Sequence, residues 1–222
     1  KGPRNNFKLV ESGRYLFIAG GIGITPMVPM IRHVAERGIP WTLLYGGRTA
    51  ESMAFVGTVG EIGGGEVHIS PEDQHGLLDL KRFLGVPQDD TAVYCCGPGP
   101  LLDAVEQHCA AWPTGALHLE RFTPKTPVPT LRSDGEFEVK LASSGESLPV
   151  RSDKTLLEVL EDAGYNIENS CRAGICGTCE VAVCAGVPDH LDDVLSDEER
   201  DSNRVILPCV SRSKTPVLVV EL

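Results

Sequence analysis

Three closely spaced cysteines and one distant cysteine constrain this chain more than any other feature of its 222 residues. Cys171, Cys176 and Cys179 follow a C-x4-C-x2-C spacing, and Cys209 lies much later in the sequence. This spacing is typical of the four thiolate ligands of a plant-type [2Fe–2S] cluster. The residues between the ligands are small, and glycine accepts the positive φ values that a tight backbone wrap requires. The sequence therefore predicts a one-electron iron–sulfur centre.

A zinc site, a disulfide framework and unrelated buried cysteines are the competing interpretations of these four residues. Structural zinc sites usually show two C-x-x-C pairs, and this chain has one. A disulfide framework is not typical of a chain this long without a visible signal peptide. Eight cysteines, at least four of them needed as thiolates, suit a reducing compartment, so we expect a cytoplasmic protein. Cys184, which ends the apolar run CEVAVC, is expected to be a small buried residue.

The net charge of −11 is distributed unevenly along the chain. Residues 1–122 carry a net charge of −3, and residues 123–222 carry one of −8. This acidity makes nucleic acid a poor partner, and it would steer a basic protein partner toward the chain. The competing interpretation is that the acidity only maintains solubility. No apolar run is long enough to cross a bilayer, so we expect no membrane partner.

The first half of the chain alternates strand and helix patterns. The expected strands are Tyr15–Ala19, Trp41–Tyr45, Glu66–Ser70, Thr91–Cys95 and Ala116–Glu120, and the expected helical segments are Pro26–Arg37, Gly76–Leu84 and Pro100–Trp112. Pro29 then has to lie in the first turn of its helix, where its missing N–H costs nothing. Strands separated by helices predict an α/β domain with a doubly wound, parallel, five-stranded sheet.

The second half reads as a separate α+β domain. Residues 123–134 contain three prolines without periodicity, which predicts an interdomain linker. Within residues 135–222, EFEVKLA, the residues around Leu148–Val150, CEVAV and PVLVVEL read as strands, and TLLEVLEDAG reads as an amphipathic helix. The pattern predicts one helix on a small mixed sheet.

Three motifs in the first half point to a nucleotide. In AGGIGITP, Gly20, Gly21 and Gly23 would let the backbone approach a pyrophosphate at a helix N-terminus. This motif departs from the full G-x-G-x-x-G fingerprint, and a glycine-rich turn is often only a tight connection. YCCGPGPLL and LHLERF, however, follow two further strands, and ligands of parallel sheets bind at the carboxyl ends of the strands.

These motifs resemble two known groups of proteins. CRAGICGTCEV, PDHLDDVLSDEER and LPCVSRS resemble the C-terminal ferredoxin domain of the phthalate dioxygenase reductase family, which includes vanillate O-demethylase reductases. GGIGITP, CCGP and LHLERF, in this order, resemble the pyridine-nucleotide domain of the ferredoxin–NADP reductase superfamily. The resemblance implies a nucleotide-binding domain over residues 1–122 and a β-grasp, plant-type ferredoxin domain over residues 135–222.

The resemblance also implies the residues of both sites. The four cysteines of the opening motif would bind the cluster, and Thr25 and Cys96 would lie near the nicotinamide. The full set expected to bind the nucleotide is Gly20, Gly21, Gly23, Thr25, Pro26, Arg48, Cys96, Gly97, Pro98 and Phe122. Arg48 follows the second strand, where the adenosine ribose is expected, and no cluster of basic residues is present there for a 2′-phosphate. NADH is therefore favoured over NADPH.

A flavin is required in this scheme because hydride transfer moves two electrons and the cluster accepts one. In the resembling family an N-terminal FMN domain meets this need, with a motif near R-x-Y-S/T that this sequence does not show. Residues 1–10 resemble the tail of such a domain. We therefore expect FMN in the full-length enzyme, with its site on a flavin domain in cis or in trans.

The leading hypothesis is a monomeric reductase component of a Rieske-type aromatic oxygenase or demethylase system. Electrons would pass from NADH through FMN to the cluster, and then to the oxygenase component. No acid–base or nucleophilic catalytic residue is needed, because the cofactors carry the chemistry. The alternative is an electron carrier and binding module without NADH oxidation of its own, and a zinc-stabilised interaction protein is the third hypothesis.

Overall fold

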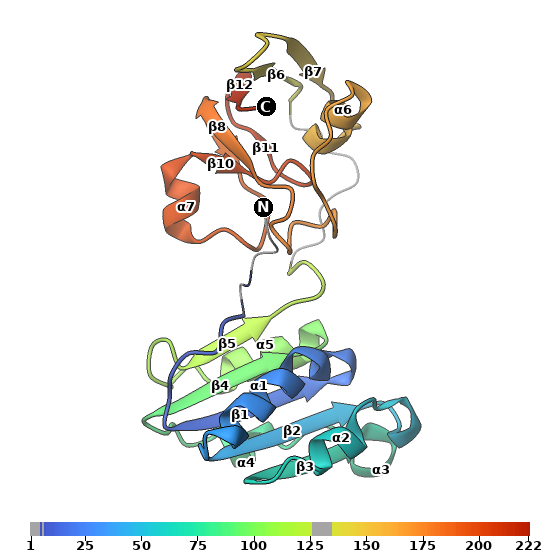
Figure 1. Ribbon diagram of the computed structural model, residues 1–222, viewed down its shortest axis with the longest axis vertical. Coiled ribbons are helices and arrows are strands. Elements are labelled where there is room, and N and C mark those ends of the chain that lie inside the picture. The colour runs from blue at the N-terminus through green and yellow to red at the C-terminus, as the bar shows by residue number, and fades with distance from the viewer. Residues whose placement is uncertain (1–4, 6, 126–134) are drawn as a thin grey trace. The chain divides into compact units, whose positions relative to one another are not determined.

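The computed structural model describes residues 5, 7–125 and 135–222, which form two compact units (Figure 1). Asn6–Phe122 make up one unit, and Thr123–Leu222 belong to the other. Most of the expected linker, residues 126–134, lies outside the described residues, as do residues 1–4 and 6 of the segment compared with a flavin domain.

The first unit is built on a five-stranded parallel sheet with the order β3-β2-β1-β4-β5. The strands are β1 (Arg14–Gly20), β2 (Trp41–Gly47), β3 (Gly65–Pro71), β4 (Thr91–Cys96) and β5 (Leu117–Glu120). The chain runs outward from β1 to β3 and then returns to the other side of β1 for β4 and β5. The strand order therefore reverses between β1 and β4, the point at which such sheets bind ligands.

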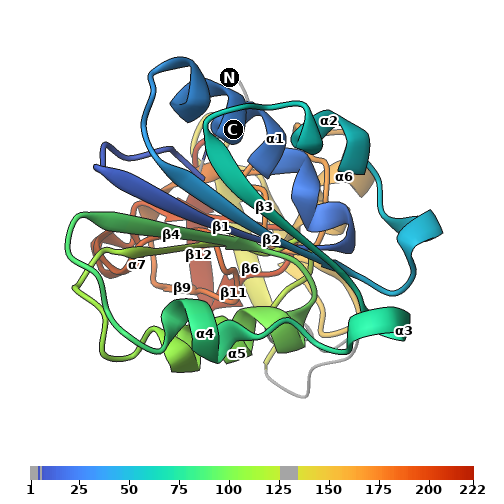
Figure 2. The same cartoon turned by 90° about the horizontal axis from the view of Figure 1, so that it is seen from below.

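Helices cover both faces of this sheet (Figure 2). Helices α1 (Ile24–Glu36) and α2 (Val56–Gly60) lie on one face, and α4 (Leu80–Leu84) and α5 (Gly99–His108) lie on the other. Because both faces are covered, the central strands β1 and β4 are almost entirely apolar after their first residues, and every residue of β4 is buried. Three shorter elements are η1 (Gly21–Gly23), η2 (Ala50–Ser52) and α3 (Glu72–His75).

The sequence predicted all five strands of this sheet, but it misplaced parts of its helices. Helix α1 begins at Ile24, so Pro29 lies beyond the first turn, where its ring removes one backbone hydrogen bond inside the helix. The expected helical segment Gly76–Leu84 is wrong in its first half, because Gly76 has a φ of 72° and ends α3. The last expected helix ends at His108, before Trp112.

The second unit contains a mixed five-stranded sheet with the order β10-β8-β12-β6-β7 and a two-stranded sheet of β11 and β9. The strands are β6 (Phe137–Leu141), β7 (Ser147–Val150), β8 (Val181–Ala185), β9 (Pro188–Asp189), β10 (Val205–Ile206), β11 (Arg212–Ser213) and β12 (Val217–Val220). Helix α6 (Leu156–Asp162) is the expected helix, and α7 (Asp197–Ser202) is an additional one. Among the strands that the structure describes in this unit, only β12 and β6 pair in parallel.

Both helices of the second unit begin at capping boxes. Thr155 and Glu158 cap α6, and Ser196 and Glu199 cap α7, each pair exchanging side-chain and backbone hydrogen bonds. The core between α6 and the sheet includes Cys179 and Cys209, both buried. Cys184, in contrast, is exposed, so its expected burial is wrong. It follows Val183, which packs against the core, and successive strand residues face opposite sides.

Candidate functional site

The loop that carries Cys171, Cys176 and Cys179 has an unusual backbone. Arg172, Gly174 and Gly177 all have positive φ values, of 50°, 71° and 72°. Gly174 also has no room for a side chain, because a Cβ there would lie 2.7 Å from Val210 Cγ2 and 3.1 Å from Asp192 Cα. Only glycine meets both conditions, so this residue holds the loop against the segments that follow it.

The four expected ligand cysteines form two pairs. Cys179 Sγ lies 3.3 Å from Cys209 Sγ, and both residues are buried. Cys171 and Cys176 are partly exposed and hydrogen-bonded to each other. Within residues 5, 7–125 and 135–222, no three His, Cys, Asp or Glu side chains converge as ligands of one metal ion. Two pairs of thiolates fit a [2Fe–2S] cluster, in which each iron takes two protein ligands.

Hydrogen bonds lower the pKa of two of these thiols, Cys176 and Cys179, and so favour the thiolate form that metal ligands require. Burial of Cys176 is outweighed by hydrogen bonds from Thr178 and Cys171, which lower the pKa of this thiol to about 7. The Cys179–Cys209 hydrogen bond lowers the pKa of Cys179 and raises that of Cys209, so this pair shares one proton. The backbone N–H of Gly174 also hydrogen-bonds the Cys209 sulfur. Such N–H···S contacts tune the potential of a cluster.

The expected nucleotide residues lie at or after the carboxyl ends of strands in the first unit. The turn after β1 and the turn after β4 meet at the point where the strand order reverses. A Cβ on Gly20 would lie 2.7 Å from Pro98 Cδ, and one on Gly97 would lie 3.0 Å from Gly20 Cα. Gly23 is more confined, because its Cβ would lie 2.0 Å from the carbonyl oxygen of Cys96. These three glycines therefore allow the two turns to pack together.

Gly21 differs from these three packing glycines. It has a φ of 54°, and a Cβ there would have nothing within 4 Å. It is thus the glycine of this motif with open space where a ligand can approach. The Thr25 hydroxyl, in the first turn of α1, donates to the carbonyl oxygen of Ile22 at 2.9 Å and fixes the turn. Pro26 follows it, half-buried.

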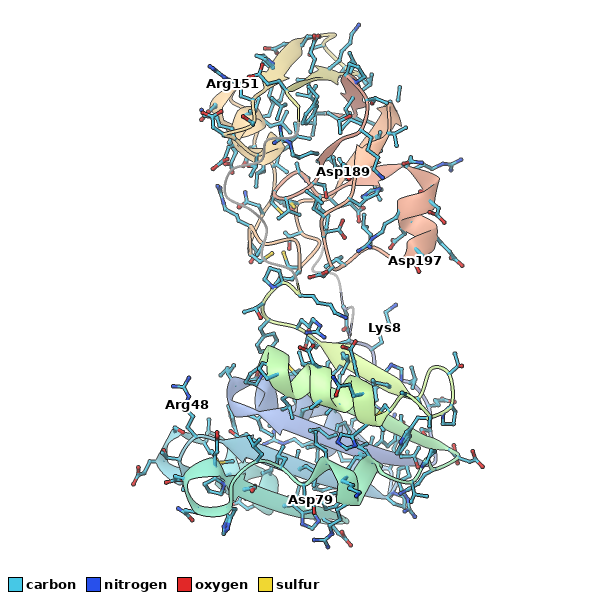
Figure 3. All side chains as sticks on the ribbon, turned by 180° about the vertical axis from the view of Figure 1, so that it is seen from behind. Lys8, Arg48, Asp79, Arg151, Asp189 and Asp197 are labelled. Atoms are coloured by element: carbon cyan, nitrogen blue, oxygen red, sulfur yellow. The ribbon has the colours of Figure 1, made fainter. Side chains whose placement is uncertain are left out.

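The remaining expected residues border this edge of the sheet. Arg48 is exposed after the end of β2 and points away from the sheet (Figure 3). Phe122 lies two residues beyond β5 and is 43% exposed, which leaves its ring available for contact. Ile22, which is not among the expected residues, is 64% exposed within the glycine turn. An apolar side chain inside a glycine-rich motif was the signal that could have identified it.

Cys96 is completely buried at the end of β4. Burial, and then the charge of Glu120 opposite it on β5, raise the pKa of the Cys96 thiol to about 12. The thiol therefore stays protonated at neutral pH and is no nucleophile. Burial also raises the pKa of Glu120 and lowers that of His118, whose ring stacks on Tyr94 with centroids 4.5 Å apart.

Comparisons with known proteins agree with both sites. The family described as a 2Fe-2S iron-sulfur cluster binding domain matches residues 139–214, and the oxidoreductase NAD-binding domain family matches residues 17–63. The chain is 41% identical to phenoxybenzoate dioxygenase subunit beta of Ectopseudomonas oleovorans, with 100% of this chain and 69% of that protein covered.

Two solved structures extend the likeness to the whole fold. A structure of phthalate dioxygenase reductase is 34% identical, with a TM-score of 0.63, and the match covers 99% of this chain and 68% of that one. An intact type IV self-sufficient cytochrome P450 monooxygenase is 38% identical, with a TM-score of 0.82, and the match covers 100% of this chain and 29% of that one.

A parallel-sheet nucleotide domain joined to an iron–sulfur domain defines a pyridine-nucleotide-dependent electron-transfer reductase. The chain belongs to the phthalate dioxygenase reductase family. Its cofactors are accordingly a [2Fe–2S] cluster and NADH, with FMN as the flavin of the family. The expected β-grasp ferredoxin domain and doubly wound nucleotide domain are confirmed. Among the described residues, no helix is both long and apolar enough to span a bilayer.

Proposed function

We propose that this chain is the reductase component of an oxygenase system that acts on an aromatic compound and contains a Rieske protein. The observation that carries the proposal is the presence, in one chain, of two paired thiol sites and two glycine turns that meet where the strand order reverses. Relatives named as a dioxygenase subunit and as phthalate dioxygenase reductase support the aromatic class. When bound, NADH supplies a hydride, FMN divides its electron pair, and the cluster carries single electrons.

The proposed roles of the residues follow from their positions. Cys171, Cys176, Cys179 and Cys209 bind the cluster as thiolates. Gly21, with its open approach, receives the pyrophosphate at the N-terminus of α1. The packing glycines Gly20, Gly23 and Gly97 bring the two ligand-binding turns together.

Other residues border the nucleotide. Thr25, Pro26 and Pro98 border the site from the turns that follow β1 and β4. Arg48 lies where the adenosine ribose is expected, and Phe122 offers an exposed ring beside the neighbouring strand end. Cys96, at the end of β4, lies beneath these turns as a neutral, buried thiol.

We propose that residues 1–122 form the nucleotide-binding domain and residues 135–222 form the cluster-binding domain. Residues 123–134 would connect the two. The flavin domain acts in cis or in trans, and a monomer is proposed. The chain spans about 69% of the length of phenoxybenzoate dioxygenase subunit beta.

Reduction of cytochrome c by NADH tests this function. The chain is assayed with a supplied FMN domain of a related reductase, with free FMN, and without flavin. NADH-dependent reduction only when the FMN domain is present supports the reductase. No reduction in any of the three assays supports the alternative, an electron carrier without NADH oxidation of its own.

The identity of the electron acceptor needs a second assay. A Rieske oxygenase component and a P450 haem domain are compared as acceptors of electrons from the reduced chain. Faster reduction of the Rieske protein supports the proposal. Faster reduction of the haem domain would overturn it, and the similarity to a self-sufficient P450 makes this comparison informative.

A further inference from the structure

Asp192 is a buried carboxylate in the segment between β9 and α7. Its side chain has no exposed surface. One oxygen, Oδ1, accepts hydrogen bonds from the backbone N–H groups of Val194 at 3.1 Å and Leu195 at 2.8 Å. Arg200 of α7 donates to the backbone carbonyl of Asp192 and lies 3.8 Å from Oδ1. The side chain of Asp192 thus stabilises a turn in its own segment, and Arg200 binds this turn from α7.

The second carboxylate oxygen of Asp192, Oδ2, takes no part in the hydrogen bonds of this turn. Oδ2 is buried and has no hydrogen-bond partner among the described residues. It faces His190, whose Nδ1 lies 3.8 Å away and whose side chain is 8% exposed. Burial lowers the pKa of His190, so this ring is neutral at pH 7 and does not balance the charge of the carboxylate. Burying a carboxylate that is only partly satisfied costs free energy. A buried carboxyl group with one unpartnered oxygen points to a role beyond the local turn.

The turn at Asp192 directly contacts the cluster loop, the loop that carries Cys171, Cys176 and Cys179. The N–H of Asp193 donates to the carbonyl oxygen of Gly174 at 3.0 Å, and a Cβ on that glycine would lie 3.1 Å from the Cα of Asp192. The N–H of Gly174 in turn hydrogen-bonds the sulfur of Cys209. Asp192 is therefore linked to a proposed cluster ligand through one hydrogen-bonded glycine, without touching the ligand itself.

We propose that Asp192 is a positioning residue that sets the reduction potential of the cluster. Its negative charge disfavours the addition of one electron nearby, and the turn it forms holds Gly174 where its N–H meets the Cys209 sulfur. Arg200 partly offsets this charge from α7. The inference rests on the proposed ligation of the cluster by the four cysteines.

Potentiometric titration of the 222-residue chain, followed by visible absorption and by EPR of the reduced cluster, tests the proposal. Asp192→Asn removes the charge and keeps an oxygen that can accept the two backbone N–H groups. We expect the ratio of reduced to oxidised cluster at a fixed potential to rise about tenfold, an upward shift of about 59 mV for one electron. Asp197→Asn is the matched control, because Asp197 is an exposed carboxylate in the same segment, at the start of α7 (Figure 3).

A second variant separates charge from structural damage. Arg200→Gln leaves the Asp192 charge less compensated. The reduction potential of the cluster in this variant should therefore shift downward, whereas it shifts upward in Asp192→Asn. An unchanged potential in Asp192→Asn, or shifts of the same sign in both variants, overturns the inference. If Asp192→Asn does not assemble a cluster, the Arg200→Gln variant tests the inference alone. A downward shift of its cluster potential supports the inference, and an unchanged or upward-shifted potential overturns it. A wild-type chain that binds no [2Fe–2S] cluster would instead refute the ligation itself.

Discussion

Cys179 Sγ lies 3.3 Å from Cys209 Sγ, although 30 residues of sequence separate the two cysteines. The contact joins the end of the cluster loop to the segment after β10, and both residues belong to the core of their unit. A hydrophobic core that includes two proposed ligand sulfurs would couple folding to cluster binding. Loss of either sulfur should therefore affect the metal site and the stability of the unit together.

Substitution of one core cysteine should abolish the cluster. Cys179→Ala leaves three thiols, and the Cys209 sulfur loses its partner, so we expect no stable [2Fe–2S] chromophore and an iron content near zero. Visible absorption and iron analysis measure this outcome. Cys184→Ala is the control, because that cysteine is exposed and should leave the absorption unchanged. A full cluster in Cys179→Ala would exclude Cys179 as a ligand.

Gly174→Ala should destabilise the iron–sulfur unit more than a comparable change elsewhere. A left-handed backbone costs an alanine about 1–2 kcal/mol, and overpacking against Val210 and Asp192 adds about 1–3 kcal/mol. Gly145→Ala is the matched control, because Gly145 has a φ of 73° but nothing within 4 Å of its Cβ position. Urea unfolding of the unit measures both variants. Equal losses of unfolding free energy in the two variants would show that the close packing around Gly174 does not contribute to stability.

Gly21→Ala should weaken nucleotide binding. An added methyl group would occupy the open space assigned to the pyrophosphate, and we expect the Kd for NADH to rise about tenfold, or about 1.4 kcal/mol. Titration calorimetry with NADH measures the change. Gly38→Ala, after the end of α1, carries the same backbone cost in equally open space, with a φ of 67° for Gly38. Binding lost equally in both variants would point to destabilisation and away from a contact at Gly21.

His118 should make the first unit sensitive to acid. Burial lowers the pKa of His118 below its ordinary value of 6.5, so on acidification the unfolded chain binds a proton before the folded one does. The contribution to stability is therefore fully present above about pH 6.5 and is lost as the pH falls toward the lower folded-state pKa. His118→Phe keeps a ring to stack on Tyr94 and should reduce this loss of stability.

Tryptophan fluorescence during urea unfolding measures this effect in the first unit alone, because both tryptophans, Trp41 and Trp112, lie there. Glu120 titrates in the wild type and in the variant, so the comparison between them isolates the histidine. His108→Phe, at the exposed end of α5, is the control. A wild-type pH profile in His118→Phe would show that another group causes the acid sensitivity.

Local patterns predicted much of the structure. The five strands of the first sheet and the main strands of the second unit were visible because apolar runs and alternation are written in neighbouring residues. Helix boundaries were less accurate. Pro29 was assigned to a first turn because the start of α1 at Ile24 depends on how the preceding glycine turn packs against the turn after β4. The short strands β9, β10 and β11 have no local pattern and exist through their pairing alone.

The sequence by itself determined the chemistry of this protein, because the spacing of four cysteines and the order of three glycine-rich or strand-end motifs are local properties. Only the tertiary structure decided which glycine packs and which is open, since Gly20 and Gly21 are indistinguishable until the turn after β4 lies against one of them. The same holds for Asp192. Its burial, its contact with Gly174 and its proximity to Arg200 arise from chain segments that meet only after folding.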